Sequence, residues 1–233
     1  MIGGSGGIGR GICLAFAEAG WFVAIHYHRG KAAAEATLKA VYDAGGDGNL
    51  YQTDIRDAYA TTHMVQAVCR DHEHLSAFVC NAGIAGSALV LRQREDGWSD
   101  VIATNLTGVF HCLRAIGPFL TARGGGSIVV IGSHAAFHGA PGQAAYASSK
   151  AGLVGLVKTA ALEWGPRNVR VNLVLPGWHD TALAHEVLPR ADGYADHALG
   201  RPPSLREMAR TVVHLAESPD VSGQIWNCDS RHL

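Results

Sequence analysis

A tyrosine and a lysine stand four residues apart in the run Tyr146-Ala147-Ser148-Ser149-Lys150. On an α-helix this spacing places both side chains on one face. A cation held near a phenol favours the phenolate, which lowers the pKa of the tyrosine from its usual value of about 10. The pair therefore predicts proton exchange with a substrate oxygen near neutral pH. The same spacing also fits two residues on a solvated helix face, so other features of the chain must decide.

A glycine-rich run, residues 3–9, comes directly before an amphipathic stretch, residues 10–19, which Gly20 ends as a helix stop. Small residues let a backbone approach a pyrophosphate, and the free amides of a helix N-terminus meet its charge. The run satisfies both the Gly-x-Gly-x-x-Gly spacing and the longer Gly-x-x-x-Gly-x-Gly spacing. It therefore predicts a dinucleotide-binding loop, with a flexible glycine-rich terminus as the alternative.

The elements that must position these residues alternate between extended and helical patterns. Strands are expected at residues 22–25, 49–52, 76–80, 127–131, 169–175 and 223–228. Helices are expected at residues 10–19, 31–44, 57–70, 98–120 and 146–164, and from a capping box that begins at Ser204. Near-continuous apolar strands between helices predict an α/β fold, with a doubly wound parallel sheet of about six or seven strands. We find no linker, so residues 1–233 are expected to form a single domain.

Composition excludes several classes of protein. Hydrophobic residues make up 48% of the chain and charged residues 17%, and the net charge of −1 gives no basic field for nucleic acid or anionic lipid. No apolar run approaches the roughly 18 residues of a membrane span, and no signal peptide is found. Five scattered cysteines predict reduced thiols and a cytoplasmic protein. The thirteen histidines include the pairs His26/His28 and His72/His74, but no cysteine lies near them, so no metal site is predicted.

Taken together, the motifs resemble those of the classical short-chain dehydrogenase/reductase family, from Gly3 to at least Cys228. The landmarks are Gly3, Gly7, Gly9, Asp54, Asn81-Ala82-Gly83, Asn105, Ser133, Tyr146, Lys150, Pro176-Gly177 and Thr181. The resemblance implies a Rossmann-like domain and an NAD(P)-dependent oxidoreductase that interconverts a carbonyl and an alcohol.

The resemblance also implies roles for four catalytic residues. Tyr146 would be the general acid in carbonyl reduction and the base in alcohol oxidation. Ser133 would donate a hydrogen bond to the substrate oxygen. Lys150 would lower the pKa of the tyrosine, and Asn105 would fix a water that links Lys150 to solvent. A hydrolase is disfavoured because no Gly-x-Ser-x-Gly elbow surrounds Ser133.

The cofactor preference depends on the end of the second strand, Ile25-His26-Tyr27-His28-Arg29. A carboxylate there would bind the adenosine ribose and repel a 2′-phosphate, but this stretch has none. Tyr27 takes the usual place of that carboxylate and His28 or Arg29 could meet a phosphate, so we expect NADP(H) to be preferred over NAD(H). Gly6 opposes this, because many NADP-dependent relatives have a basic residue there. The expected cofactor-binding residues are Gly3, Ser5, Gly7, Ile8, Gly9, Tyr27, His28, Arg29, Asp54, Ile55, Asn81, Ala82, Gly83, Tyr146, Lys150, Pro176, Gly177, His179 and Thr181.

Among branches of the family, the chain looks most like the 3-oxoacyl-acyl-carrier-protein reductases. Residues 105–110, 142–146 and 223–227 carry this likeness. It implies reduction of a ketone such as a 3-oxoacyl thioester. The alternatives are dehydrogenation of another secondary alcohol, such as a polyol, sugar or steroid, and a nucleotide-binding regulator without turnover. An acyl carrier protein is a doubtful partner, because Ser127 stands where several carrier-protein reductases have a basic residue.

Further expectations concern the substrate pocket and the assembly. His134 and His138 either line the pocket, where they would mark a polar substrate, or face solvent. Residues 182–203 match the variable substrate lid of the family. Relatives imply a homotetramer or homodimer that pairs the helices at 98–120 and 146–164.

The start of the chain departs from the family pattern, because only Met1 and Ile2 precede Gly3 where relatives have a strand of five or six apolar residues. We therefore expect a truncated first strand in the middle of the sheet. Unpaired backbone groups on its neighbours would cost on the order of 1–3 kcal/mol each. The chain is either shortened relative to a longer product, which is the preferred interpretation, or the sheet adapts to a two-residue stub.

Overall fold

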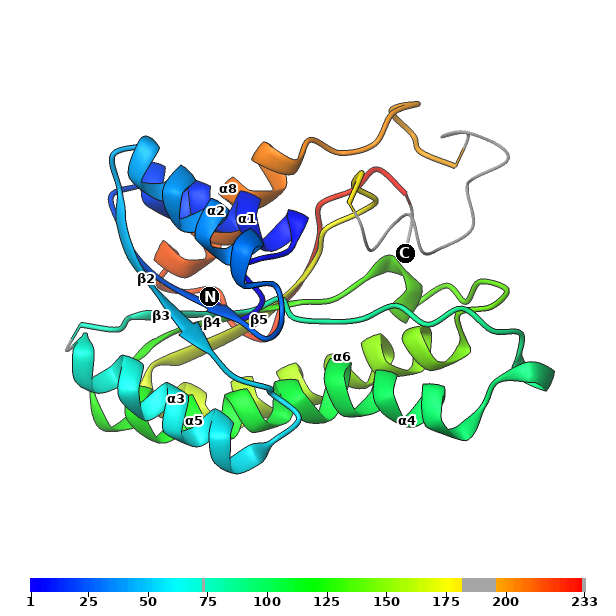
Figure 1. Cartoon of the computed structure of the whole chain (residues 1–233), viewed down its shortest axis with the longest axis horizontal. Coiled ribbons are helices and arrows are strands. Elements are labelled where there is room, and N and C mark those ends of the chain that lie inside the picture. The colour runs from blue at the N-terminus through cyan, green and yellow to red at the C-terminus, as the bar shows by residue number, and fades with distance from the viewer. Residues whose placement is uncertain (73, 182–195, 232–233) are drawn as a thin grey trace.

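The computed structural model describes residues 1–72, 74–181 and 196–231 and has three layers (Figure 1). A parallel sheet lies between two layers of helices, as expected. On one face lie α1 (Gly7–Glu18), α2 (Lys31–Asp43) and α8 (Leu205–Glu217). On the other face lie α3 (Ala58–Asp71), α4 (Glu95–Ile102), α5 (Gly108–Ala122) and α6 (Ala144–Trp164).

Two blocks of strands make up the sheet. β1 (Phe22–Tyr27) pairs with β2 (Asp47–Gln52). The second block has the order β3-β4-β5-β6. Its strands are β3 (Ala77–Cys80), β4 (Gly126–Ile131), β5 (Val169–Leu175) and β6 (Ile225–Asn227). All pairs are parallel, so the carboxyl ends of the strands meet at one edge.

The first residues of the chain join the two blocks. Ile2 donates its N–H to the carbonyl of Val79 at 2.8 Å and accepts from the N–H of Asn81 at 3.0 Å. On the other side, the N–H of His26 donates to the carbonyl of Met1 at 2.9 Å. This short stretch therefore satisfies neighbouring backbone groups that a truncated first strand was expected to leave unpaired. The described residues thus contain six strands, and Met1 and Ile2 lie between the two blocks.

The alternation of side chains along β4 shows why the strand sequences are apolar almost throughout. Ile128 and Val130 belong to the core beneath α5 and α6, whereas Val129 and Ile131 belong to the core beneath α1 and α8. These four side chains are at most 3% exposed. Successive side chains of a strand point to opposite faces, so a sheet covered on both faces must be apolar at every position.

The helix expected at 98–120 is divided in the structure. α4 ends at Ile102, a π-helical turn spans Ala103–Thr107, and α5 begins at Gly108. π-Helical turns inside helices are rare and often occur at functional sites. This turn contains the predicted site residue Asn105.

Candidate active site

The predicted residues gather at the carboxyl edge of the sheet. Ser133 follows β4, Asn81 follows β3, and Pro176 follows β5. The glycine-rich run enters α1 at Gly7. Open parallel sheets bind ligands in the crevice outside this edge, so the fold brings the glycine loop and the predicted catalytic residues to one side.

The glycine loop is a tight turn, which excludes the alternative of a flexible terminus. Gly3 has φ +73°, and a Cβ on it would lie 2.7 Å from the backbone of Ala82. A Cβ on Gly9 would lie 2.1 Å from the carbonyl oxygen of Gly3, and one on Gly7 would lie 2.6 Å from the Cγ2 of Thr181. No side chain fits at these positions, so the loop forms a cradle open to a pyrophosphate at the start of α1. It also places Thr181 directly against the loop.

Asn81 and Ser5 connect this loop to its surroundings. The Nδ2 of Asn81 donates to the carbonyl oxygen of Gly3 at 2.9 Å. The Oγ of Ser5 lies 3.7 Å from the place of a Cβ on Gly30, just before α2. Ile8, in the first turn of α1, is half-buried. The residues present therefore fit a dinucleotide phosphate, with backbone amides as the donors.

The adenosine end of the predicted site contains an ion network. The carboxylate of Asp54 accepts from the Nη2 of Arg56 at 2.7 Å, and the Nε2 of His28 lies 3.7 Å from the same oxygen. The hydrogen bonds from Arg56 lower the pKa of Asp54 to about 2. Arg56 also binds Asp100 at 3.2 Å. Sequence patterns did not single out Arg56, although the Asp-x-Arg spacing with Asp54 makes this a local contact.

Three other residues predicted at this end differ in exposure. Tyr27 is 7% exposed, and its hydroxyl donates to the Oε1 of Gln52 in β2 at 3.4 Å. Arg29 is exposed. Ile55 is 3% exposed and packs against Gly108, where a Cβ would lie 2.7 Å from its Cγ1. The structure thus places Tyr27 and Ile55 within the protein and leaves Arg29 at the surface.

Ser133 and Tyr146 come together through their hydroxyls. Ser133 has an extended backbone, with φ −162°, and its Oγ accepts from the N–H of Ala135 at 3.2 Å. Burial raises the pKa of Tyr146, and a side-chain hydrogen bond with Ser133 opposes this increase. Two hydroxyls from different elements thus converge at one point, as a site that binds a carbonyl oxygen requires.

The pKa of Tyr146 is raised in this structure and not lowered as expected, although Lys150 lies near its ring. Lys150 Nζ lies 5.8 Å from the centre of the Tyr146 ring and donates to the carbonyl of Ile131 at 2.9 Å. Burial, which favours the neutral phenol, has the largest effect on the pKa of Tyr146 and raises it. Burial also lowers the pKa of Lys150 from 10.5 to about 8.

Asn105 is fully buried and joins the π-helical turn to α6. Its Oδ1 accepts from the N–H of Ile84 at 2.8 Å, and its Nδ2 donates to the Oγ of Ser149 at 3.2 Å. Ser149 in turn donates to the carbonyl oxygen of Tyr146 at 2.7 Å. A Cβ on Gly83 would lie 3.2 Å from the Oδ1 of Asn105 and 3.7 Å from the Nζ of Lys150. The side chain therefore lies near Lys150, and the linking water stays a prediction.

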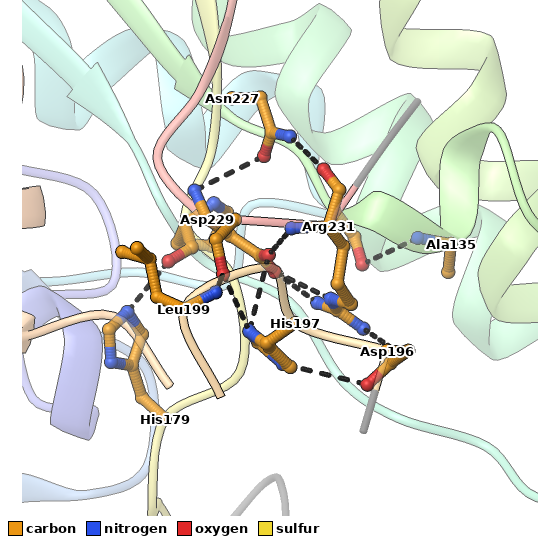
Figure 2. Close-up of polar contacts among 11 residues, drawn as sticks. Ala135, His179, Asp196, His197, Leu199, Asn227, Asp229 and Arg231 are labelled. Carbon is orange, nitrogen blue, oxygen red and sulfur yellow. Dashed lines mark hydrogen bonds and ion pairs between the residues drawn. The ribbon is translucent and has the colours of Figure 1, made fainter. Parts of the chain in front are cut away.

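A further wall of the site comes from residues that follow β5 and β6 (Figure 2). The Nε2 of His179 lies 2.8 Å from the carbonyl oxygen of Pro176, and His179 is 7% exposed. Gly177 has φ +80°, and a Cβ there would lie 2.8 Å from the Cβ of Asp229. The imidazole of His179 thus contacts the main chain of its own turn, residues 176–179. This turn packs against the segment after β6.

Asp229 is the centre of a buried ion cluster that sequence patterns missed (Figure 2). Its carboxylate accepts from the Nε of Arg231 at 2.7 Å and lies 3.6 Å from the Nδ1 of His197. The side chains of Asp229 and His197 are 0% exposed. The two residues are far apart in sequence, so local spacing gives no signal of the pair. Of the predicted lid at 182–203, residues 182–195 lie outside the described residues.

The predicted substrate-side residues have mixed surroundings. His134 and His138 stack, with ring centres 4.4 Å apart and planes 11° apart, directly after Ser133. His138 is exposed. Ser127 is fully buried, and its Oγ donates to the carbonyl oxygen of Leu215 at 3.2 Å. Ser127 therefore presents no surface to a carrier protein.

The described ranges contain neither a cluster of metal ligands nor a membrane-spanning helix. Within residues 1–72, 74–181 and 196–231, no group of three or more His, Cys, Asp or Glu side chains could hold a metal ion. No helix in this part of the chain is long and apolar enough to cross a membrane.

The three-layer parallel fold, the glycine cradle and the paired hydroxyls define an oxidoreductase that uses a nicotinamide dinucleotide. The family model described as short chain dehydrogenase matches residues 1–192. The chain belongs to the short-chain dehydrogenase family, and it is an NAD(P)-dependent oxidoreductase of that family.

Curated relatives and a solved structure agree with this assignment. The 3-oxoacyl-(acyl-carrier-protein) reductase FabG of Staphylococcus aureus is 40% identical over 93% of this chain and 89% of its own length. The corresponding reductase of Thermotoga maritima is 35% identical over 98% of this chain and 94% of its own length. A crystal structure from Sinorhizobium meliloti, described as a short-chain alcohol dehydrogenase, has a TM-score of 0.93 and 28% identity, and the match covers 99% of this chain and 93% of that one.

Proposed function

We propose that the protein uses NADP(H) to reduce a ketone, of the 3-oxoacyl thioester type, to a secondary alcohol. The observation that carries this proposal is the convergence of the hydroxyls of Ser133 and Tyr146 at the carboxyl edge of the sheet, near Lys150. The names of the curated relatives, which are 3-oxoacyl-(acyl-carrier-protein) reductases, support this substrate class.

The catalytic residues are suited to the reductive direction. A bound nicotinamide would supply hydride to the carbonyl carbon. Ser133 and Tyr146 would both donate hydrogen bonds to the carbonyl oxygen, which stabilises the negative charge that develops there. The pKa of Tyr146 is raised by burial, so its phenol is protonated at neutral pH and can act as a general acid. The ammonium of Lys150, 5.8 Å from the ring centre, would then stabilise the phenolate.

The preference for NADP(H) is supported by charge at the end of β1. Arg29 is exposed there and His28 lies beside it, with no carboxylate in the same stretch. Arg56 and His28 lie against the carboxylate of Asp54. The negative charge of Asp54 is therefore balanced by these basic side chains. A 2′-phosphate would not be repelled there as it is by the lone carboxylate of NAD-dependent enzymes.

A second candidate, oxidation or reduction of another small polar alcohol or ketone, is favoured by the stacked pair His134 and His138. Two imidazoles beside Ser133 suit a polar substrate better than an acyl chain. The buried position of Ser127 also weakens an acyl carrier protein as partner.

The experiment is to measure NADPH and NADH consumption by the purified protein with acetoacetyl-coenzyme A, simple ketones, quinones and keto sugars. We expect NADPH oxidation with the thioester, and a decrease in kcat of about 10²–10³-fold in Ser133→Ala, because one donor to the oxyanion is lost. Ser148→Ala, on the exposed side of α6, is the matched control. Activity with keto sugars alone would favour the second candidate, and no oxidation with any carbonyl would refute both.

We also propose a homodimer or homotetramer of cytoplasmic location. Phe110 of α5 is 43% exposed and Leu162 of α6 is 80% exposed, so these helices present apolar side chains. Light scattering after size exclusion tests this, and a monomer at micromolar concentration would contradict it.

A further inference from the structure

The side chain of His26 joins two segments of the proposed cofactor site. His26 lies in β1 and is 3% exposed. The N–H of Gly3 donates to its Nδ1 at 3.1 Å. Its Nε2 lies 3.0 Å from the carbonyl oxygen of Thr53. Gly3 opens the glycine loop, and Thr53 directly precedes Asp54 at the adenosine end.

These two contacts determine the tautomer of the ring. A backbone amide only donates, so the Nδ1 must be the unprotonated acceptor. The Nε2 then has the proton and donates it to the carbonyl of Thr53, which only accepts. Burial lowers the pKa of His26 to about 4, opposed by the hydrogen bond with Thr53. The ring is therefore neutral at pH 7, and both hydrogen bonds are kept.

Gly3 is held closely on every side. Its φ is +73°, and a Cβ on it would overlap the backbone of Ala82 at 2.7 Å. Its carbonyl oxygen accepts from the Nδ2 of Asn81 at 2.9 Å, while its N–H binds His26. Both polar backbone atoms of Gly3 are thus bound by side chains, one from β1 and one from the residue that follows β3. These two side chains set the direction in which the loop approaches α1.

We propose that His26 is a positioning residue for dinucleotide binding, which fixes the separation between the phosphate loop at Gly3 and the adenosine end at Thr53 and Asp54. The inference rests on the proposed function, because a bound dinucleotide would contact both segments. Both ring nitrogens of His26 bind backbone atoms, and these atoms belong to two different segments of the proposed site.

Three substitutions separate the two arms of the imidazole. His26→Asn places an amide oxygen near the position of Nδ1 and keeps the Gly3 contact. His26→Gln reaches the position of Nε2 and keeps the Thr53 contact. His26→Leu keeps neither, and it leaves a buried N–H and a buried carbonyl without these partners. We expect the Kd for NADPH, measured by titration calorimetry, to increase about tenfold or more in the Leu variant and less in the Asn and Gln variants.

The matched control is His72→Leu. His72 is half-buried, and its Nε2 lies 3.1 Å from the hydroxyl of Tyr51. Its ring packs against Phe22, the first residue of β1, at the opposite end of that strand from the cofactor edge. We expect this variant to bind NADPH as the wild type does.

Nitrogen-15 NMR of the wild type provides a test that does not depend on how the variants fold. A neutral ring protonated at Nε2 is expected at pH 7, and a ring protonated at Nδ1 would overturn the proposal. A Kd for NADPH that is unchanged in His26→Leu would also overturn it. So would His26→Asn and His26→Gln variants that regain the wild-type melting temperature but bind NADPH as weakly as His26→Leu. A wild type that binds neither NADPH nor NADH would instead refute the proposed function, before any variant is compared.

Discussion

The buried lysine allows a quantitative prediction, because its charge opposes folding. Burial lowers the pKa of Lys150 from 10.5 to about 8. This difference makes the ammonium cost about 3 kcal/mol of folding free energy at pH 7. Lys150→Met keeps the length of the side chain and removes the charge. It also removes the hydrogen bond to the Ile131 carbonyl, and this loss offsets about 1–2 kcal/mol of the stability gained by removing the buried charge.

We therefore expect Lys150→Met to unfold with a free energy about 1–2 kcal/mol higher at pH 7 while it loses activity. The effect depends on pH in a defined direction. The pKa is lower in the folded chain, so the unfolded chain binds more protons between pH 8 and 10.5. The wild type gains stability as the pH rises through that window, and the variant does not. The advantage of the variant should shrink by about 2 kcal/mol between pH 7 and 9.5.

Urea unfolding at pH 7.0 and 9.5, followed by circular dichroism, measures both quantities. Lys158→Met is the control, because Lys158 is an exposed lysine on the same helix, and its unfolding free energy should differ from the wild type by less than about 0.5 kcal/mol. The reasoning is refuted if Lys150→Met is less stable than the wild type at both pH values by the same amount. That result would mean that the ammonium is well solvated in the folded protein.

Three further predictions concern the loop, the core and acid stability. Gly9→Ala should lower the unfolding free energy by at least about 2 kcal/mol, because its Cβ would lie 2.1 Å from a backbone oxygen. Gly6→Ala, whose Cβ would be 4.0 Å from any neighbour, should change it by less than about 0.5 kcal/mol; equal effects in thermal melts would contradict this. Arg170→Met should lower the free energy of unfolding, measured with urea, by about 2–4 kcal/mol, because Arg170 donates to three carbonyls at the end of α8. Arg167→Met, at an exposed arginine, should leave it nearly unchanged. The pKa of His26 is lowered to about 4, so the folded wild type should lose about 3 kcal/mol of stability relative to His26→Asn as the pH falls from 7 to 4. Unfolding free energies that fall equally with pH in the two proteins would disprove this.

The sequence was sufficient to predict the parallel α/β fold, because apolar strands and glycine-ended helices alternate over nearly the whole chain. It also predicted that Ser133 and Tyr146 would meet, since the motif positions belong to a known family. It did not predict the pKa of Tyr146 correctly. That value depends on how deeply the phenol is buried and on where the ammonium of Lys150 points, which spacing along a helix does not determine.

Other features of the site depend on contacts between distant segments or on the detailed geometry of a helix. The sequence alone does not assign a role to His26, because the backbone groups of Gly3 and Thr53 meet its ring only in the folded sheet. The pair of Asp229 and His197 has no local pattern, because residues far apart in sequence form it. The π-helical turn at Asn105 was also missed, since helix propensity does not distinguish it from a continuous helix.

In the proposed mechanism, Tyr146 donates the proton to the substrate oxygen. The most direct measurement is the rate of NADPH oxidation with a ketone substrate in Tyr146→Phe, with NADPH affinity measured on the same preparation. We predict a loss of about 10²–10⁴-fold in kcat with the Kd for NADPH nearly unchanged. A rate within a few-fold of the wild type would contradict the mechanism.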